Sequence, residues 1–155
     1  MDIEQARTAF TELRGSEDRV AAAELDEIWA ALATVRPEEI LGAWHGDDFD
    51  TGHPAGGMLQ KLRWHGKTFN SLSDAEPMVC RDEDGELFSN LEAGKGAASL
   101  WMVEFRGEST ATMVYDGQPI LDHFKRVDDD TLMGIMNGKG ILADGQHYYF
   151  LLERG

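Results

Sequence analysis

The segment Gly42-Ala43-Trp44-His45-Gly46 is the feature that most restricts the fold of this 155-residue chain. Glycine allows turns and close backbone approach, and tryptophan carries a large apolar ring that requires burial. We interpret the segment as the first strand of a small β-barrel in which Trp44 closes the floor. Because a closed barrel of about eight strands encloses space for one small ligand, the pattern favours a ligand-binding cup.

Helical periodicity precedes this segment, and strand signals follow it. Apolar residues recur at steps of three and four in 3–13 and in 18–33, which predicts two amphipathic helices covering one end of the barrel. Pro37-Glu38-Glu39 predicts one further helical turn. Residues 58–64 are compatible with a helical turn or a strand. Beyond Gly66, apolar runs bounded by turn residues predict strands at 77–81, 86–91, 97–106, 109–115, 119–127, 131–137 and 147–154.

The length of the chain suits one core, so we expect a single domain over residues 1–155. Residues 1–36 would form a helical segment packed on the barrel, and residues 37–155 would form the barrel itself. The predicted fold class is mainly β with N-terminal helices, built as an antiparallel β-barrel of about 8–9 strands.

Charge and cysteine content limit the partners. The chain has 14 basic and 29 acidic side chains, and its net charge of −15 opposes binding to nucleic acid or an anionic membrane. No apolar run reaches the ~20 residues of a membrane-spanning helix. The single cysteine, Cys80, cannot form an internal disulfide. We therefore expect a cytoplasmic monomer or homodimer whose partner is a small molecule.

Acidic residues on the predicted strands are the candidate catalytic groups. A barrel lumen raises the pKa of a carboxylate by desolvation, so Asp122 and Glu104 suit general acid–base chemistry. Tyr115 and His53 are the candidate proton donors. His53 follows the first barrel strand in a loop that would fold over one end, where functional residues are common.

Aromatic, basic and long apolar side chains are the candidate ligand contacts, because flat rings and flexible thioethers accommodate apolar molecules. Arg106 lies two residues after Glu104, and Arg126 lies four residues after Asp122. Either pair would orient a polar ligand if it faced inward, or form a surface ion pair if it faced outward. Strand alternation leaves both arrangements open. The candidate ligand contacts are Trp44, Trp64, Lys67, Trp101, Arg106, Met113, Phe124 and Arg126.

Metal and cofactor signals are weak. The five histidines show no His-x-x-x-His or His-Glu-x-x-His spacing, so no metal site is predicted. Acid–base chemistry in a dry pocket needs no cofactor. Haem requires only one axial histidine in an apolar cup, so a haem-binding barrel stays open as an alternative.

The order of several motifs resembles a family of bacterial proteins in which a GXWXG domain precedes a small C-terminal domain of unknown function. The likeness is carried in the first half by Gly42-Ala43-Trp44-His45-Gly46, Thr51-Gly52-His53-Pro54 and Trp64-His65-Gly66-Lys67-Thr68-Phe69. In the second half it is carried by Glu104-Phe105-Arg106-Gly107, Pro119-Ile120-Leu121-Asp122-His123-Phe124 and Tyr149-Phe150-Leu151-Leu152-Glu153-Arg154. The family implies a compact β-rich unit without a settled activity. The Gly-x-Trp start is also similar to calycin barrels such as lipocalins, fatty-acid carriers and haem-binding nitrobindins.

The sequence therefore predicts that the chain binds a small hydrophobic or aromatic organic molecule in a barrel cavity. It leaves open whether the cavity also performs cofactor-independent acid–base catalysis, such as isomerisation, cyclisation, dehydration or decarboxylation. The alternatives are a nitrobindin-like haem barrel and a carrier without catalysis.

Overall fold

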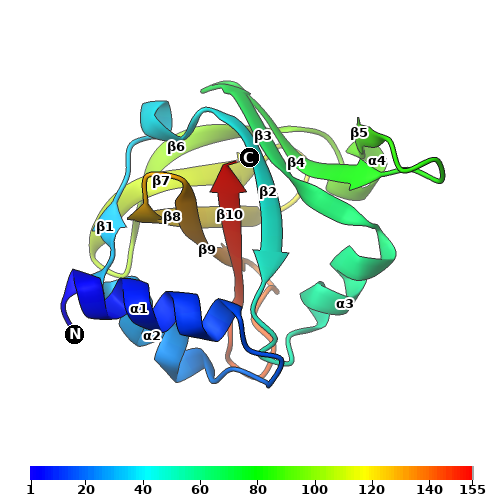
Figure 1. Ribbon diagram of the computed structural model, residues 1–155. Coiled ribbons are helices and arrows are strands. Elements are labelled where there is room, and N and C mark those ends of the chain that lie inside the picture. The colour runs from blue at the N-terminus through cyan, green and yellow to red at the C-terminus, as the bar shows by residue number, and fades with distance from the viewer. Residues whose placement is uncertain (155) are drawn as a thin grey trace.

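The computed structural model describes residues 1–154 and shows a mainly β protein with helices at its N-terminus (Figure 1). The helical elements are α1 (Ile3–Arg14), α2 (Ala22–Ala31), the 3-10 turn η1 (Pro37–Ile40), α3 (Pro54–Lys61) and α4 (Leu91–Gly94). The strands are β1 (Ala33–Thr34), β2 (Gly42–Asp48), β3 (Trp64–Ser71), β4 (Asp74–Arg81), β5 (Leu87–Ser89), β6 (Ala98–Phe105), β7 (Glu108–Tyr115), β8 (Ile120–Asp128), β9 (Thr131–Gly138) and β10 (Tyr148–Arg154). None of the helices within residues 1–154 combines the length and the apolar character needed to cross a membrane.

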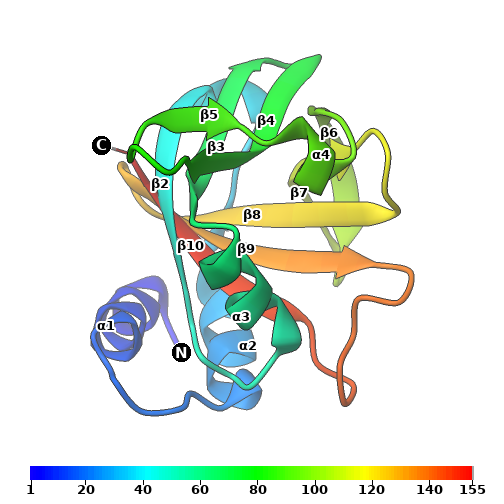
Figure 2. The ribbon, with the colours of Figure 1, turned by 90° about the vertical axis from the view of Figure 1, so that its right-hand side faces the viewer.

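Antiparallel pairing closes eight of these strands into a ring. The order is β8-β7-β6-β4-β3-β2-β10-β9, and β9 pairs in turn with β8. The seam between β4 and β6 is thin, since it consists of the single pair Ala75–Ala98, and α4 lies beside β4 (Figure 2). Outside the ring, β1 pairs with β8 and β5 pairs with β4. The predicted fold class is confirmed as a mainly β, antiparallel and barrel-like sheet that follows N-terminal helices.

The Gly42–Gly46 segment begins β2 and brings two tryptophans into close packing. Trp44 is buried, and its Nε1–H donates a hydrogen bond to the Ile40 carbonyl at 2.8 Å. A Cβ at Gly46 would lie 2.1 Å from the Trp64 ring, so only glycine leaves room for that indole. Trp44 thus fills the inner core beside η1, and Gly46 seats Trp64 further along the same strand.

Two apolar cores lie on opposite faces of β10. Tyr148, Phe150 and Leu152 belong to the inner core of the ring, whereas Tyr149 and Leu151 pack outside it with residues of α1 and α2. Successive side chains of a strand point to opposite faces, so a strand between two cores is apolar on both. The expectation that the helices cover one end of the barrel is corrected, because they cover the outer face of the wall.

Three segments differ from the elements predicted for them. Residues 58–64 are divided between the end of α3 and the start of β3. The strand expected at 86–91 stops at Ser89, because the Asn90 side chain caps α4 and accepts a hydrogen bond from Ala93 N at 3.0 Å. The helix expected over 18–33 is shorter at both ends: it spans Ala22–Ala31, and Ala33–Thr34 pair with β8 as β1.

The close approach of β2 and β3 gives a test of this packing. In the variant Gly66→Ala the new Cβ would lie 1.9 Å from the Trp44 carbonyl oxygen, which is backbone and cannot rotate away. We expect the free energy of unfolding, measured in urea, to fall by about 1–3 kcal/mol or more. Gly57→Ala is the matched control, since no atom lies within 4 Å of its Cβ and alanine is favoured in a helix by about 0.5–1 kcal/mol. Equal stability of the two variants would contradict the proposed packing.

Candidate functional site

A cavity of about 440 Å³ occupies the end of the ring opposite to Trp44. The two ends are distinguished by β10, whose first residue Tyr148 lines the cavity while its Arg154 pairs with Trp44. We call this cavity the Asp122 pocket. Its lining residues come from α3 and its two ends, from α4, from the β7–β8 and β9–β10 loops and from the strands: His53, Pro54, Ala55, Met58, Leu59, Leu62, Trp64, Lys67, Met78, Ala93, Tyr115, Gln118, Ile120, Asp122, Met136, Gly140, Ile141, Leu142, Ala143, Tyr148 and Phe150.

A buried ion pair forms the polar part of the wall. Lys67 Nζ lies 3.0 Å from Asp122 Oδ2, and the two residues are 3% and 1% exposed. The same ammonium donates to the Pro77 carbonyl at 3.3 Å and to the Tyr115 hydroxyl at 3.5 Å. The three N–H groups of Lys67 therefore have three oxygen acceptors, all within the protein.

Aromatic rings surround the same ammonium group. Lys67 Nζ lies 5.3 to 5.7 Å from the ring centroids of Phe150, Trp64 and Tyr115. The faces of these rings attract a cation, and the attraction is stronger in a desolvated site. Trp64 is itself fixed, because its Nε1–H donates to the Pro77 carbonyl at 3.1 Å. The lysine is thus held in one position at the edge of the cavity.

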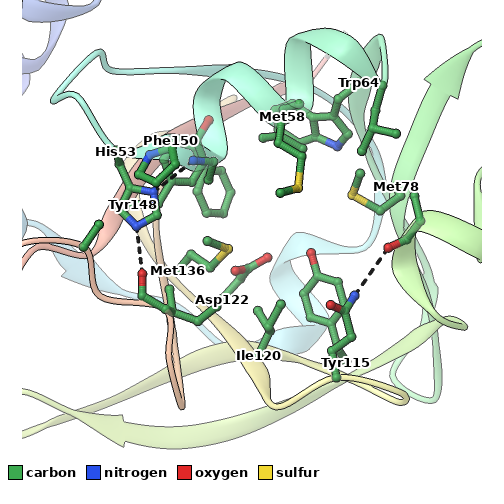
Figure 3. A pocket seen from close by; sticks show the side chains of 18 of the residues that line it. His53, Met58, Trp64, Met78, Tyr115, Ile120, Asp122, Met136, Tyr148 and Phe150 are labelled. Atoms are coloured by element: carbon green, nitrogen blue, oxygen red, sulfur yellow. Dashed lines mark hydrogen bonds between the residues drawn. The ribbon is translucent and has the colours of Figure 1, made fainter.

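The two carboxylate oxygens of Asp122 have different surroundings, since Oδ2 contacts Lys67 and Oδ1 does not. Asp122 Oδ1 is buried and has no hydrogen-bond partner within residues 1–154. Figure 3 shows the carboxyl group directed toward the middle of the cavity. Burial raises the pKa of Asp122, and the opposing effects of Lys67 and Tyr115 reduce the rise without cancelling it. Asp122 Oδ1 is therefore a polar atom on the pocket wall that can accept or carry a proton.

Tyr115 keeps its proton in this environment. Burial raises the pKa of its hydroxyl well above the usual value, and the neighbouring Asp122 carboxylate raises it further. A neutral phenol can donate one hydrogen bond and accept another. Tyr115 is thus available as a hydrogen-bond donor beside the carboxylate.

The open end of the pocket is covered by α3 and the β9–β10 loop. His53 caps α3, because its Nδ1 accepts a hydrogen bond from Ala55 N at 3.1 Å. Its Nε2 lies 2.8 Å from the Ile141 carbonyl in the loop, so the ring is protonated on Nε2 and donates there. Nearby, the Tyr148 hydroxyl donates to Asp48 Oδ2 at 2.7 Å. The first contact connects the start of α3 to the β9–β10 loop, and the second connects β10 to β2.

Five of the predicted site residues meet in the pocket: Asp122, Tyr115, His53, Trp64 and Lys67. Three others, Trp44, Met113 and Phe124, are buried in the inner core and are not part of its lining.

Two predicted site residues on β6 are placed wrongly by the sequence analysis. Trp101 is 60% exposed, because Leu100 and not Trp101 belongs to the face of β6 that enters the inner core. Glu104 is exposed near the tip of the β6–β7 hairpin. Arg106, in the turn of that hairpin, instead binds Asp26 on α2 at 2.8 Å. These three side chains do not line the pocket.

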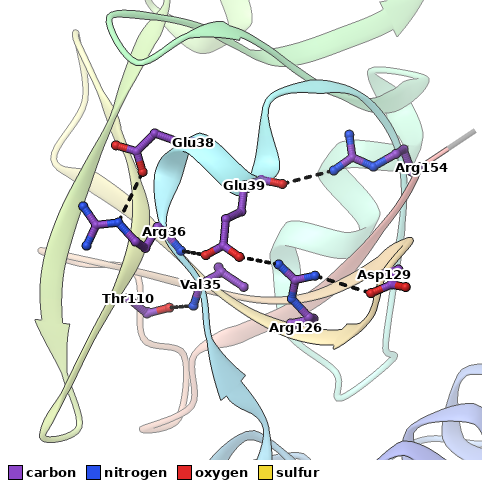
Figure 4. Close-up of polar contacts among 8 residues, drawn as sticks. All are labelled: Val35, Arg36, Glu38, Glu39, Thr110, Arg126, Asp129 and Arg154. Atoms are coloured by element: carbon purple, nitrogen blue, oxygen red, sulfur yellow. Dashed lines mark hydrogen bonds and ion pairs between the residues drawn. The ribbon is translucent and has the colours of Figure 1, made fainter.

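The prediction that Arg126 contacts a ligand is also corrected, because this residue binds η1 at the closed end of the ring (Figure 4). Its guanidinium binds the Glu39 carboxylate of η1 at 2.8 Å. Arg154 donates to the Leu41 carbonyl at 2.8 Å and lies 4.1 Å from the Trp44 ring centroid. The two arginines hold η1 against the end of the ring that Trp44 fills, away from the Asp122 pocket.

Sequence reasoning missed several lining residues. Phe150 and Tyr148 lie on one face of the last predicted strand, and that alternation was a usable signal. The thioethers of Met58, Met78 and Met136 come from three separate elements, so no local pattern groups them. The β9–β10 loop gave only turn signals, which do not show that it folds back over the cavity.

The ion pair gives a test of the site's electrostatics. Lys67→Met should destabilise the protein by about 3–5 kcal/mol, because it leaves a buried carboxylate without its partner. Lys67 lowers the pKa of Asp122, so its removal raises that pKa further in the folded state. The Asp122 carboxyl group then keeps its proton in the folded protein at pH values where the unfolded chain has released it. The free energy of unfolding of the variant should then fall by up to ~1.4 kcal/mol per pH unit as the pH rises above about 4.

Urea unfolding of Lys67→Met and of the unmodified protein at about pH 5 and about pH 8 measures this difference. The double variant Lys67→Met/Asp122→Leu is the control, because it removes both charges and should recover most of the loss at the higher pH. A loss in Lys67→Met that does not depend on pH would contradict the assignment.

Comparisons with known proteins identify the family of this chain. Residues 27–85 match the model of the GXWXG protein family, and residues 96–154 match a domain of unknown function (DUF4334). A crystal structure of a protein from Thermomonospora curvata is similar, with 38% sequence identity and a TM-score of 0.87, over 97% of this chain and 99% of that chain. No curated protein matches. The chain therefore belongs to the family in which a GXWXG domain is followed by a DUF4334 domain.

Proposed function

We propose that this protein binds a small, largely apolar organic molecule in the Asp122 pocket. The observation that carries the proposal is the buried and unpartnered Asp122 Oδ1 on the wall of a cavity of about 440 Å³. Cavities of roughly 300–1,000 Å³ with an apolar lining and few polar groups are typical of small-molecule sites. Protein interiors otherwise leave few voids larger than a water molecule, which argues against a packing defect of this size.

The composition of the wall supports an apolar occupant. Three thioethers, from Met58, Met78 and Met136, and the rings of Trp64 and Phe150 face the cavity. Methionine side chains adapt to irregular shapes, and aromatic rings contact flat molecules over a large area. A single polar group on such a wall fixes the orientation of a ligand and adds specificity.

Acid–base catalysis is a second candidate function, favoured by the state of Asp122. A carboxyl group whose pKa is raised by burial is closer to the pH at which general bases work well. The neutral hydroxyl of Tyr115 lies in the same pocket and can donate a hydrogen bond to a developing negative charge on the ligand. This set suits the removal and return of a proton, as in an isomerisation.

The arrangement does not support haem. Among residues 1–154, the histidine that lines the pocket is His53, and both of its ring nitrogens are engaged, with Ala55 N and the Ile141 carbonyl. An axial ligand needs a free nitrogen. We therefore propose an organic ligand and not the haem-binding alternative.

Binding can be tested with N-phenyl-1-naphthylamine, a neutral dye whose emission rises in apolar sites. We expect saturable fluorescence enhancement with the unmodified protein. Ile120→Trp places a bulky ring on the pocket wall in place of a smaller aliphatic side chain and should weaken binding by about tenfold or more. Leu87→Trp is the control, since Leu87 is 48% exposed and lies outside the lining. Absence of saturation, or equal weakening in both variants, would refute the proposal.

Catalysis can be tested by solvent deuterium exchange at the carbon next to the carbonyl of 2-decalone. A general base contributes about 10²–10⁴-fold, so Asp122→Asn should remove most of any acceleration over buffer, while Glu104→Gln, an exposed carboxylate, should retain it. Because the base acts when ionised, the rate should rise with pH through the raised pKa of Asp122. No acceleration by the unmodified protein, or equal loss in both variants, would leave binding as the function.

A further inference from the structure

The charges on the pocket wall restrict the ligand beyond its being apolar. Lys67 is the single lysine or arginine among the described lining residues, and its three N–H groups are taken by Asp122, Pro77 and Tyr115. The ion pair therefore has no net charge, and its cation has no free donor. What the wall still offers is the second oxygen of Asp122 and the neutral hydroxyl of Tyr115.

An anionic ligand does not fit this balance. A carboxylate that reached the polar wall would meet Asp122 Oδ1, and Lys67 already neutralises that residue. Two carboxylates that share one site raise the cost of ionising both, and a buried charge without its own partner costs several kcal/mol. The wall therefore disfavours molecules of the fatty-acid type.

A cationic ligand is disfavoured for the complementary reason. An ammonium group at Asp122 Oδ1 would lie close to Lys67, whose Nζ is 3.0 Å from the other oxygen of the same carboxylate. Two cations would then share one buried carboxylate, and the site would carry a net positive charge.

A neutral hydroxyl group meets every condition. It donates to Asp122 Oδ1 when the carboxylate is ionised, and its oxygen accepts from Asp122 when that group is protonated. The contact leaves the Lys67 bonds intact and adds no charge. It also satisfies a buried polar atom whose lack of a partner otherwise costs about 1–3 kcal/mol.

We infer that the ligand class is a neutral alcohol or phenol with an apolar carbon body, and that its hydroxyl group bonds to Asp122 Oδ1. This inference rests on the proposed function of the pocket. The hydroxyl lies at the polar wall, and the carbon body lies among Met58, Met136 and Phe150 toward α3. Carboxylates and amines of the same shape bind more weakly.

The test is a series of ligands with one ring system and different polar groups: naphthalene, 2-naphthol, 2-naphthoate and 2-naphthylmethylamine. Displacement of N-phenyl-1-naphthylamine at neutral pH measures their affinities. We expect 2-naphthol to bind about tenfold more tightly than each of the other three, which is the order of one added hydrogen bond to a charged group.

The variant Asp122→Ala separates this inference from general hydrophobic binding. It removes the acceptor and frees the ammonium of Lys67, so the preference should reverse and 2-naphthoate should become the tightest ligand of the series. Glu104→Gln, at an exposed residue outside the pocket lining, retains the ion pair and its acceptors and should keep the preference for 2-naphthol. Circular dichroism checks the folding of both variants, and the order of affinities in the unmodified protein decides the inference if Asp122→Ala does not fold.

The outcomes are distinct. Equal affinities across the series, a preference for 2-naphthoate in the unmodified protein, or no displacement by 2-naphthol would overturn the inference, while dye binding in the pocket would still support the proposed function. No saturable binding of the dye itself would instead refute the proposed function.

Discussion

The buried ion pair between Lys67 and Asp122 is the constraint on which the rest of the site depends. Removing two charges from water is costly, and the cost is recovered only where geometry and additional hydrogen bonds are good. Lys67 meets that condition through Pro77 and Tyr115, so β3, β4, β7 and β8 are held together at one level of the ring. Only one oxygen of Asp122 has such a partner, because Oδ1 has no hydrogen bond within residues 1–154. An apolar side chain that filled the cavity would leave the other oxygen permanently without a partner, which explains why this level of the ring stays open.

Sequence reasoning recovered the architecture, because turn residues and short apolar runs report strands locally. It also selected Asp122, Tyr115 and Lys67 by their chemistry. It could not decide which face of a strand points inward. Alternation along a strand separates the residues into two faces but does not show which face is buried. Trp101 was misplaced for that reason. The partners of Arg106 and Arg126 come from α2 and η1, 80 and 87 residues away, so no spacing along one strand could have identified them.

Both halves of the chain that match family models contribute to one ring and one pocket. The segment 27–85 supplies β2, β3 and β4, and the segment 96–154 supplies β6 to β10. Lys67 comes from the first and Asp122 from the second. The two segments meet at the thin β4–β6 seam and at the β2–β10 pairing, which spans five residue pairs. Neither segment could bury its charged residue without the partner from the other segment. The Lys67–Asp122 pair therefore makes the stability of each segment depend on the other.

The two ends of the ring are closed in different ways, and under the proposed function this difference indicates where a ligand would enter. At the closed end, Trp44 is buried beneath η1, and Arg126 and Arg154 fix that turn. At the other end, α3 has no buried residue among its eight. A hydrogen bond from His53 connects its start to the β9–β10 loop, and one from Tyr148 connects β10 to β2. Segments with few buried contacts open at low cost. Opening there leaves the Lys67–Asp122 pair and its acceptors in place. The polar wall would then already be organised for the proposed ligand, and little binding energy would be lost in ordering it.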